Sequence, residues 1–270
     1  MKKLLLLVVL QLLILTNLCS DETISQKDLE KSLKEKYSKE DKLVYLNIAT
    51  STALIGYGLA YWDYDFLHTQ AHTKSEGWFS KDTKSGGADK FGHAYTGYFT
   101  SHMFSYTYEN WGYSHDEAAL NGSLSSLLFT AIMEIGDSFS PYGFSYEDMT
   151  ANTLGAILGY YTYKDTTLRE KLDFRVEYKV RKDSFEEDFM TDYENLKYIF
   201  ALKASGFSSI KNKYLKYLEL YLGYGVEGFA DEPYLKRREP FIGIGINLSK
   251  LLDTKIFNYY QIPGIYLHKE

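Results

Sequence analysis

The sequence is short of cysteine and of positive charge. Its one cysteine, Cys19, excludes an intramolecular disulfide, and it neither supports nor excludes an oxidising compartment. The formal net charge is −6, whereas a protein that binds nucleic acid needs a basic face. We therefore expect no nucleic-acid partner.

The first residues predict export. Lys2 and Lys3 precede an apolar run from Leu4 to Leu15 and a small polar exit, which is the pattern of a secretory signal peptide over residues 1–20. The apolar run is short for a membrane span. An uncleaved membrane anchor is the alternative interpretation.

Cys19 lies where bacterial lipoproteins carry their lipidated cysteine. The residue before it, Leu18, replaces the small residue that a lipoprotein signal normally has at this place. Lipidation of Cys19 and cleavage after Ser20 are therefore both open at this stage.

Aromatic residues are plentiful, with 26 Tyr and 16 Phe but only 4 Pro. Tyrosine combines an apolar ring with a polar hydroxyl and is favoured at the boundary between membrane and water. A tyrosine-rich β-sheet would give the same composition.

Charged residues are absent from four stretches that are rich in small residues: 43–62, 91–108, 118–133 and 150–163. Their lengths suit helices, and the GxxxG pattern at 155–159 suits close contact between helices. Most of them are near the short end for a bilayer span of about 20 residues. We therefore favour a compact bundle seated at a membrane surface over insertion of every helix.

The second half of the chain predicts strands. Residues 173–180 alternate apolar and charged side chains, the period of a half-buried strand. Three further strands are expected at 198–204, 214–225 and 241–248, the last two being joined by a charged loop. Four antiparallel strands are too few for a membrane barrel, so the sheet is expected to pack on the helices or against a partner.

Helices followed by strands indicate the α+β class: a bundle of about four helices, then a tyrosine-rich antiparallel sheet of about four strands. The predicted organisation is a signal peptide (1–20), a charged helical spacer (21–42), a helical core domain (43–165) and an antiparallel β region (166–270).

Asp89 and His93 are four residues apart on the second predicted helix and share a face. The carboxylate could fix the tautomer of the imidazole, as at catalytic or metal sites. Alternatively, Asp89 caps the helix and His93 packs in the bundle. His102 points to the opposite side of this helix, so the two histidines cannot share a site. His68 and His72 have a spacing that suits a metal only in a helix, and their polar surroundings favour an exposed loop.

Two helix starts are visible as capping patterns. Ser114 with Glu117 forms a capping box, and Ser145 with Asp148 has the same form. Asn152, one turn after Asp148, has no such duty, and we expect its amide to bond a neighbouring helix or turn.

Glu134 and Asp137 lie at the predicted C-terminal end of a helix, where the helix dipole disfavours negative charge. Lys90, a protonated His93, the N-terminus of the next helix or a bound cation could compensate. The two acids with His93 could form a divalent-metal site or an acid/base pair. A buried hydrogen-bonded network that locks the helices together uses the same residues and is preferred, because no nucleophile or complete ligand set is readable.

The segments "GGADKFGHAY" and "EIGDSFSPYGFSYEDMTANTLGA" resemble the YfiM-like family of predicted periplasmic lipoproteins, and more distantly VanZ-like membrane proteins. The resemblance covers about residues 43–163, and "YLGYGVEGF" and "FIGIGINL" resemble the trailing part of longer members. The matching positions are Asp89, Lys90, Gly92, His93, Ala94, Tyr95, Glu134, Asp137, Gly143, Phe144, Ser145, Asp148, Met149, Ala151, Asn152 and Gly155. The resemblance implies an envelope compartment, and it implies no reaction or cofactor.

Two functions of different classes remain. One is a structural or binding protein of the cell envelope, pinned by a buried polar network that includes Asp89, Lys90, Asp148 and Asn152. The other is a hydrolase or transferase acting on lipid or cell-wall substrates, with His93 as the base. The expected partners are a membrane surface or outer-membrane lipid, and a protein partner is an alternative. Lipid or small-molecule binding between bundle and sheet is a third, less defined reading.

Overall fold

The computed structural model describes residues 37–180, 191–229 and 236–269. The predicted signal peptide, Cys19 and most of the predicted spacer lie outside these residues. The chain divides into two compact units, residues 1–46 and 47–270. In the described part of the first unit, Ser38 caps helix α3 (Lys39–Tyr61) by accepting a hydrogen bond from the backbone N–H of Asp41. Helix α3 continues into the second unit.

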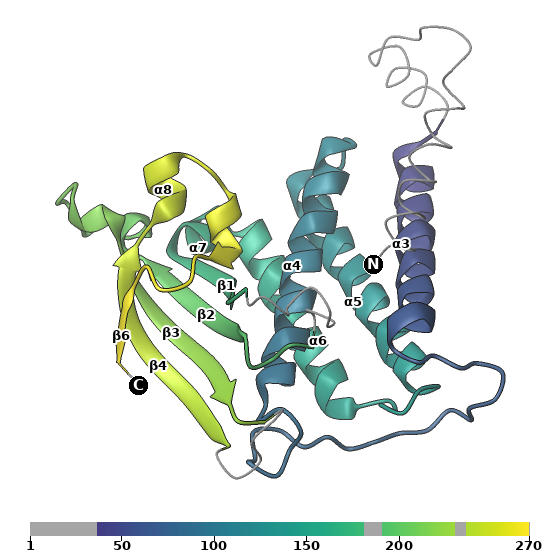
Figure 1. Cartoon of the computed structure of the whole chain (residues 1–270). Coiled ribbons are helices and arrows are strands. Elements are labelled where there is room, and N and C mark those ends of the chain that lie inside the picture. Colours follow the sequence, from purple (N-terminus) through teal and green to yellow (C-terminus); the bar gives the residue numbers. More distant parts are fainter. Residues whose placement is uncertain (1–36, 181–190, 230–235, 270) are drawn as a thin grey trace, which may run out of the picture. The chain divides into compact units, whose positions relative to one another are not determined.

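The second unit begins with helices (Figure 1). After the C-terminal part of α3 come α4 (Ala88–Asn110), α5 (His115–Asp137), α6 (Tyr146–Lys164) and the short α7 (Thr166–Lys171). Both predicted helix starts are confirmed, but only the first is a reciprocal capping box. Ser114 and Glu117 form a reciprocal capping box at α5, and the Ser145 hydroxyl accepts from the backbone N–H of Asp148 at α6.

Glycines let α4 and α6 approach closely. A Cβ on Gly155 would lie 1.9 Å from the Ala94 carbonyl oxygen, and one on Gly97 would lie 2.4 Å from the carbonyl oxygen of Asn152. Neither position can hold a larger residue without moving a backbone. The small-residue pattern thus serves close helix contact, as predicted.

The chain then forms one six-stranded sheet in the order β5-β1-β2-β3-β4-β6. Its four long strands, β1 (Leu172–Tyr178), β2 (Leu196–Lys203), β3 (Leu218–Glu227) and β4 (Arg237–Ile246), pair antiparallel in sequence. Two short strands extend the edges. β5 (Tyr260–Gln261) pairs parallel with β1, and β6 (Leu267–Lys269) pairs antiparallel with β4.

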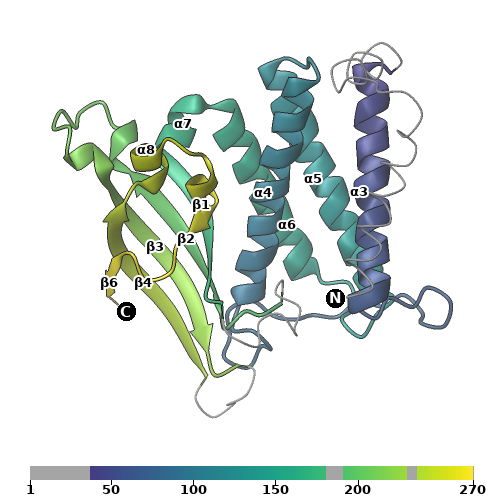
Figure 2. The ribbon, with the colours of Figure 1, turned by 45° about the horizontal axis from the view of Figure 1, so that its top comes forward.

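Helix α4 lies beside one face of the sheet (Figure 2). Its residues Ala88 and Tyr98 share an apolar core with Phe174 of β1 and Tyr198 of β2. On the other face, Tyr221 and Phe241 pack against Tyr266, from the segment that joins β5 to β6. Because β5 and β6 lie at opposite edges, this segment crosses and covers that face.

The α+β prediction is confirmed, including the four helices and the four antiparallel strands. The sheet differs in having two added edge strands and one parallel pair. The strand expected from residue 214 starts at Leu218, because Leu215–Tyr217 form a 3₁₀ turn (η2). Turns of this kind carry no hydrophobic period that separates them from a strand.

Candidate functional site

Three helix ends meet at one end of the bundle. The N-terminal turns of α4 and α6 and the C-terminal turn of α5 bring polar side chains together there. The polar cluster, as we call it, consists of Glu76, Asp89, Lys90, His93, Glu134, Asp137, Asp148 and Asn152. Glu76 comes from the loop before α4, which Glu147 holds through bonds to Ser75 Oγ (2.5 Å) and Gly77 N (3.3 Å).

Lys90 is the central cation of the polar cluster and is only 2% exposed. Its Nζ donates to Asp89 Oδ2 (2.6 Å), Asp148 Oδ1 (2.7 Å) and Glu76 Oε2 (3.2 Å). Asp89 also accepts from the Ser85 hydroxyl at 2.5 Å. The buried ammonium group thus joins α4, α6 and the loop before α4. Its three bonds to carboxylates offset the cost of removing the charge from water.

His93 and Asn152 form the second half of the polar cluster. His93 Nδ1 lies 3.3 Å from Asn152 Oδ1 and 3.4 Å from Glu134 Oε1, and its Nε2 lies 3.6 Å from Asp148 Oδ1. The Asn152 amide donates to Glu134 Oε1 at 3.0 Å. Asn152 therefore bonds two neighbouring helices at once, as predicted for its buried amide.

Glu134 is 1% exposed at the unfavourable end of its helix. Its Oε2 accepts from the backbone N–H of Ser145, the N-cap residue of α6, at 3.4 Å. The sequence suggested several groups that could stabilise this carboxyl group. The structure places the N-terminus of the next helix against Glu134, and His93 lies next to Glu134 as well.

Burial strongly changes the acidity of three members. It raises the pKa of Glu134 to about 9, with the negative charge of Asp148 adding to the effect. Burial also raises the pKa of Asp137 to about 7, although a hydrogen bond from Tyr64 favours the ionised form. The pKa of Glu76 rises to about 7 through burial and the charge of Asp148. At neutral pH Glu134 is therefore protonated.

Asp148 and Lys90 keep their charges. Burial alone would raise the pKa of Asp148, but His93 and Lys90 hold it below its ordinary value. Burial alone would lower the pKa of Lys90, and the charges of Asp89 and Asp148 raise it instead. The polar cluster thus contains the ion pair of Lys90 and Asp148. Its acids with raised pKa values, Glu76, Glu134 and Asp137, can take up protons.

Two triplets within the polar cluster have ligand atoms within 4.8 Å of one another: His93 with Glu134 and Asp148, and Glu76 with Asp89 and Asp148. The first offers one imidazole nitrogen and two carboxylates, a mixed set that a divalent metal accepts. In the second, Lys90 already donates to all three acids. The first triplet therefore has the donor types that suit a divalent metal, and Lys90 donates to only one of its members, Asp148.

The structure brings together all seven residues predicted for the polar cluster. It differs from the prediction in which acid pairs with His93. Asp89 does not cap α4, whose N-cap residue is Gly87 with no side-chain cap bond. It binds Ser85 and Lys90, whereas Asp148 is the carboxylate near Nε2 of His93. The helical spacing of Asp89 and His93 indicated a shared face, but the contacts across helices decide which acid serves the histidine.

Glu76 and Tyr64 join this site without having been predicted from sequence. Both lie in the irregular segment between α3 and α4, where no helical period relates them to the other residues. The only signal was local: Glu76 stands next to a glycine and an aromatic residue, close before the "GGADK" motif.

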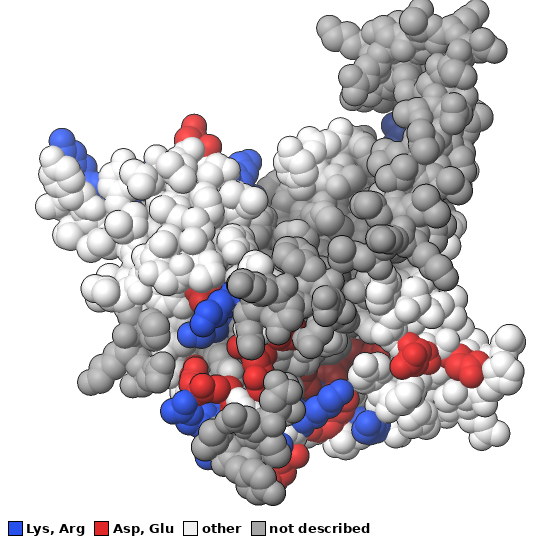
Figure 3. Space-filling view, in the orientation of Figure 1, with Lys and Arg blue, Asp and Glu red and all other residues white. Residues whose placement is uncertain are grey.

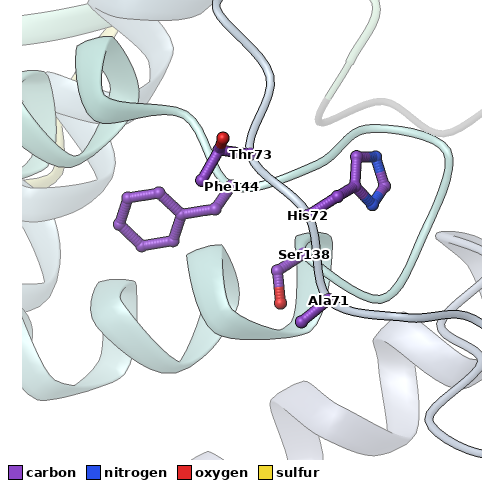
Figure 4. Close-up of a pocket in the computed structure, with 5 residues that line it drawn as sticks. All are labelled: Ala71, His72, Thr73, Ser138 and Phe144. Atoms are coloured by element: carbon purple, nitrogen blue, oxygen red, sulfur yellow. The ribbon is translucent and has the colours of Figure 1, made fainter.

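His68, His72 and His102 lie outside the polar cluster. His68 is exposed in a turn and pairs with Asp65. His102 is buried and bonds Tyr259 and Thr162. His72 lines a groove of about 490 Å³ whose other lining residues are Ala71, Thr73, Ser138 and Phe144 (Figure 4). None of these lining residues belongs to the polar cluster.

A second group of buried polar side chains, most of them charged, lies on the face of the sheet opposite α4, next to Tyr221. This sheet cluster consists of Asp173, Arg175, Lys203, Glu219 and Gln261. Arg175 donates to both oxygens of Glu219 at 2.7 Å and to Asp173 at 2.6 Å. Lys203 donates to Asp173 at 2.5 Å. Two cations thus balance two acids in a bidentate arrangement.

Residues 75–164 match the model of a family described as predicted periplasmic lipoprotein (DUF2279). The matched range holds every residue of the polar cluster. No curated protein and no solved structure matches the chain. The match confirms the predicted location, that of a protein exported to the periplasm or the outer membrane of a Gram-negative-type bacterium.

Proposed function

We propose that this chain is a non-enzymatic, membrane-associated protein of the cell envelope. In this proposal lipid contacts the apolar faces of its helices, and the polar cluster ties their ends together. The finer resemblances to YfiM-like and VanZ-like proteins and the lipidation of Cys19 stay predictions.

The observation that carries the proposal is the pattern of α5, which is inverted relative to a helix in water. Its buried side is small and polar, including Ser123, Ser126 and Thr130. Its exposed side carries large apolar residues in one stripe: Leu120, Leu124, Leu128 and Ile135, each at least 47% exposed. A helix in water buries its large apolar side chains, whereas lipid-facing bundles pack small residues inside.

Hydrogen bonds explain how the small polar side of α5 packs. The Ser126 hydroxyl donates to the Gly97 carbonyl at 2.8 Å, and Ser123 donates to the Ala156 carbonyl at 3.0 Å. Hydroxyls therefore link α5 to both neighbouring helices. Such bonds need no apolar core between the helices, which leaves the leucines free to face outward.

The other helices support the same reading. α4 exposes Phe99, Met103 and Tyr106, and α6 exposes Leu154, Ile157 and Tyr161. By length and composition α3 and α5 could cross a membrane; 11% of the tested stretch of α3 and half of that of α5 are buried. Figure 3 shows acidic and basic side chains gathered toward the lower part of the face it draws, with a mostly uncharged surface above them over the sheet.

Alkaline carbonate extraction of membranes that contain the full-length chain tests the proposal. Cys19→Ser removes the predicted lipid anchor, and N-terminal sequencing identifies the protein from which residues 1–20 have been cleaved, so any attachment of that protein comes from the rest of the chain. We expect Cys19→Ser to stay in the membrane pellet. Release into the soluble fraction would contradict the proposal.

A paired substitution locates the attachment. Adding Leu124→Asp to Cys19→Ser places a charge in the apolar stripe, and we expect it to release most of the protein. The matched control Asn110→Asp adds the same charge at the exposed end of α4 and is expected to leave the pellet unchanged. Equal behaviour of the two variants would argue against lipid contact at α5.

The second candidate, a hydrolase or transferase on lipid or cell-wall substrates, has one supporting observation. The His93 side chain is 17% exposed and lies 3.4 Å from Glu134 and 3.6 Å from Asp148. An imidazole between carboxylates suits a general base. Mass spectrometry of phospholipid and peptidoglycan fragments incubated with the protein tests it: products that disappear with His93→Gln, while the fold is retained, would favour the enzyme.

A further inference from the structure

The face of β3 and β4 that continues the α4-packed face of β1 and β2 carries an aliphatic ladder of six residues; Leu222 lies in one row with Phe200 and Phe174. The register places Leu218 opposite Ile246, Leu220 opposite Ile244 and Leu222 opposite Ile242. All six side chains are between 40% and 58% exposed. Leu267 of β6, paired with Ile244 and 84% exposed, extends the middle row.

The opposite face of the same strands packs Tyr221 and Phe241 against Tyr266 and also holds buried charge. Alternating with the ladder, Glu219 and Tyr221 of β3 lie on this face, where Glu219 binds Arg175 of the sheet cluster. All three are at most 2% exposed. Burying charge while exposing leucine and isoleucine is the reverse of what water favours. It matches strands whose outer face contacts lipid.

The two ends of the ladder correspond to the two ends of the helical bundle. At one end, Tyr224 donates to the Gly86 carbonyl and Arg238 to the Phe79 carbonyl, next to the start of α4 and the polar cluster. At the other end, Leu172, which follows α7 directly, belongs to the row of Leu220. The exposed apolar faces of the helices thus lie at the same level as the ladder.

Tyrosines lie at both ends of the ladder, and lysines at one of them. Tyr224 follows Leu222 at one end, and Tyr214 and Tyr217 precede Leu218 at the other. Lys213 lies over the ring of Tyr214, and Lys250 over that of Tyr217. Aromatic rings with basic neighbours at the border of an apolar band are typical of the membrane interface.

We infer that the aliphatic ladder of β3 and β4 is a lipid-binding surface that enters the hydrocarbon layer of one leaflet. From Leu218 to Leu222 a strand advances about 13 Å at about 3.3 Å per residue, close to half of a hydrocarbon core of about 30 Å. The sheet then shares the membrane contact of the helices. The inference rests on the proposed function and extends it to the second half of the chain.

The side-chain chemistry favours acyl chains over a protein partner. Cores of protein interfaces are enriched in Tyr, Trp and Arg, which supply hydrogen bonds as well as area. The ladder offers only leucine and isoleucine, and its tyrosines stand at the borders. A uniform aliphatic surface fits a fluid, unstructured apolar phase.

Spin-label accessibility in vesicles of phosphatidylcholine and phosphatidylglycerol tests the inference. Full-length chain is labelled at Leu220→Cys or Ile244→Cys, and the signal of the chain with Cys19 alone is subtracted. Oxygen concentrates in the apolar layer, whereas a nickel chelate stays in water. We expect both ladder labels to be several-fold more accessible to oxygen than to nickel, and the control Lys213→Cys to show the opposite. Circular dichroism confirms that each variant is folded.

Labels at Leu124→Cys and Ile157→Cys on the helices separate this inference from the proposed function. Nickel-accessible ladder labels with oxygen-accessible helix labels would overturn the ladder and leave the proposed function standing. Nickel access at all four positions would overturn both. Ladder labels shielded from both reagents would show a protein partner or a second copy, and would also overturn the inference.

Discussion

The polar cluster at the helix ends and the sheet cluster both bury acidic and basic side chains. The charges of the sheet cluster balance, whereas acids outnumber bases in the polar cluster. In the sheet cluster, Arg175 and Lys203 balance Asp173 and Glu219. The polar cluster has five acids, Glu76, Asp89, Glu134, Asp137 and Asp148, around one lysine and one histidine. It takes up protons instead, since burial raises the pKa of Glu134 to about 9.

This difference indicates what each cluster can do. A balanced bidentate network gives fixed geometry and little response to solution conditions. An acid-rich cluster has an excess of carboxyl groups, and their negative charge can be neutralised by a proton or a cation. A structural role therefore accounts for the sheet cluster, whereas the polar cluster can respond to pH.

The largest effect is expected from Arg175→Met. It leaves Asp173 and Glu219 buried without their main partner, which costs about 3–5 kcal/mol of unfolding free energy. The control Arg237→Met breaks only an exposed pair with Glu227 and should cost less than about 1 kcal/mol. Urea unfolding followed by circular dichroism measures both, and equal losses would contradict the difference between buried and exposed pairs.

Lys90→Met should cost somewhat less, about 3 kcal/mol at neutral pH. It removes the partner of Asp89 and Asp148, but acids in this cluster can take up protons in compensation. The loss should therefore shrink as the pH falls to 5, unlike that of Arg175→Met. Lys164→Met, which removes an exposed lysine, serves as the control. A loss independent of pH would show that the acids do not compensate.

Asn152→Ala should destabilise the fold by about 1–3 kcal/mol, because Glu134 and His93 both lose a buried partner. Asn110→Ala, on the exposed end of α4, is the matched control and should change little. Thermal unfolding compares the two. Unchanged stability of Asn152→Ala would argue against a locking role for the polar cluster.

The smallest expected effect is a slope with pH. Glu134 has a folded pKa of about 9 against an ordinary value of 4.5, so its stabilising contribution is complete below pH 4.5 and is lost as the pH rises toward 9. Each pH unit costs at most about 1.4 kcal/mol. Between pH 7 and 9 the wild type should lose stability, and Glu134→Gln should lose less. The exposed control Asp116→Asn should keep the wild-type slope, and a slope unchanged in Glu134→Gln would contradict the raised pKa.

The window above pH 7 avoids most of the titration of three other groups. The pKa values of Asp137 and Glu76 both rise to about 7, so their similar contributions are lost mainly below that pH. Burial lowers the pKa of His102 to about 4, which makes the fold gain stability between about pH 4 and 6.5. Measurements below pH 7 would mix these opposite slopes.

Much of the fold could be predicted because local chemistry specifies it. Ser114 and Ser145 start their helices through bonds to backbone N–H groups within three residues. The alternation in β1 is equally local. The edge strands β5 and β6 were not predicted, since two or three residues carry no period and their pairing depends on distant strands.

The sequence predicted which residues form the site better than it predicted which of them bond to one another. Asn152 could be assigned a partner on another helix because an amide without a local duty must bond elsewhere. Which carboxylate lies near Nε2 of His93 could not be read, because Asp89 and Asp148 differ only in how α4 and α6 pack. Glu76 was missed, since its loop is placed by Glu147, 71 positions further along the chain.

The sequence by itself determined the elements, their caps and the small-residue faces, because each depends on neighbours within one or two turns. Only the tertiary structure decided which acids share Lys90, and that leucines of α5 and isoleucines of β4 are exposed while serines of α5 and Arg175 are buried. Periodicity locates the two faces of an element, and only packing shows which one is buried. In α5 and at Glu219 of β3 the buried face is the polar one, and that orientation is the basis for placing the apolar one against lipid.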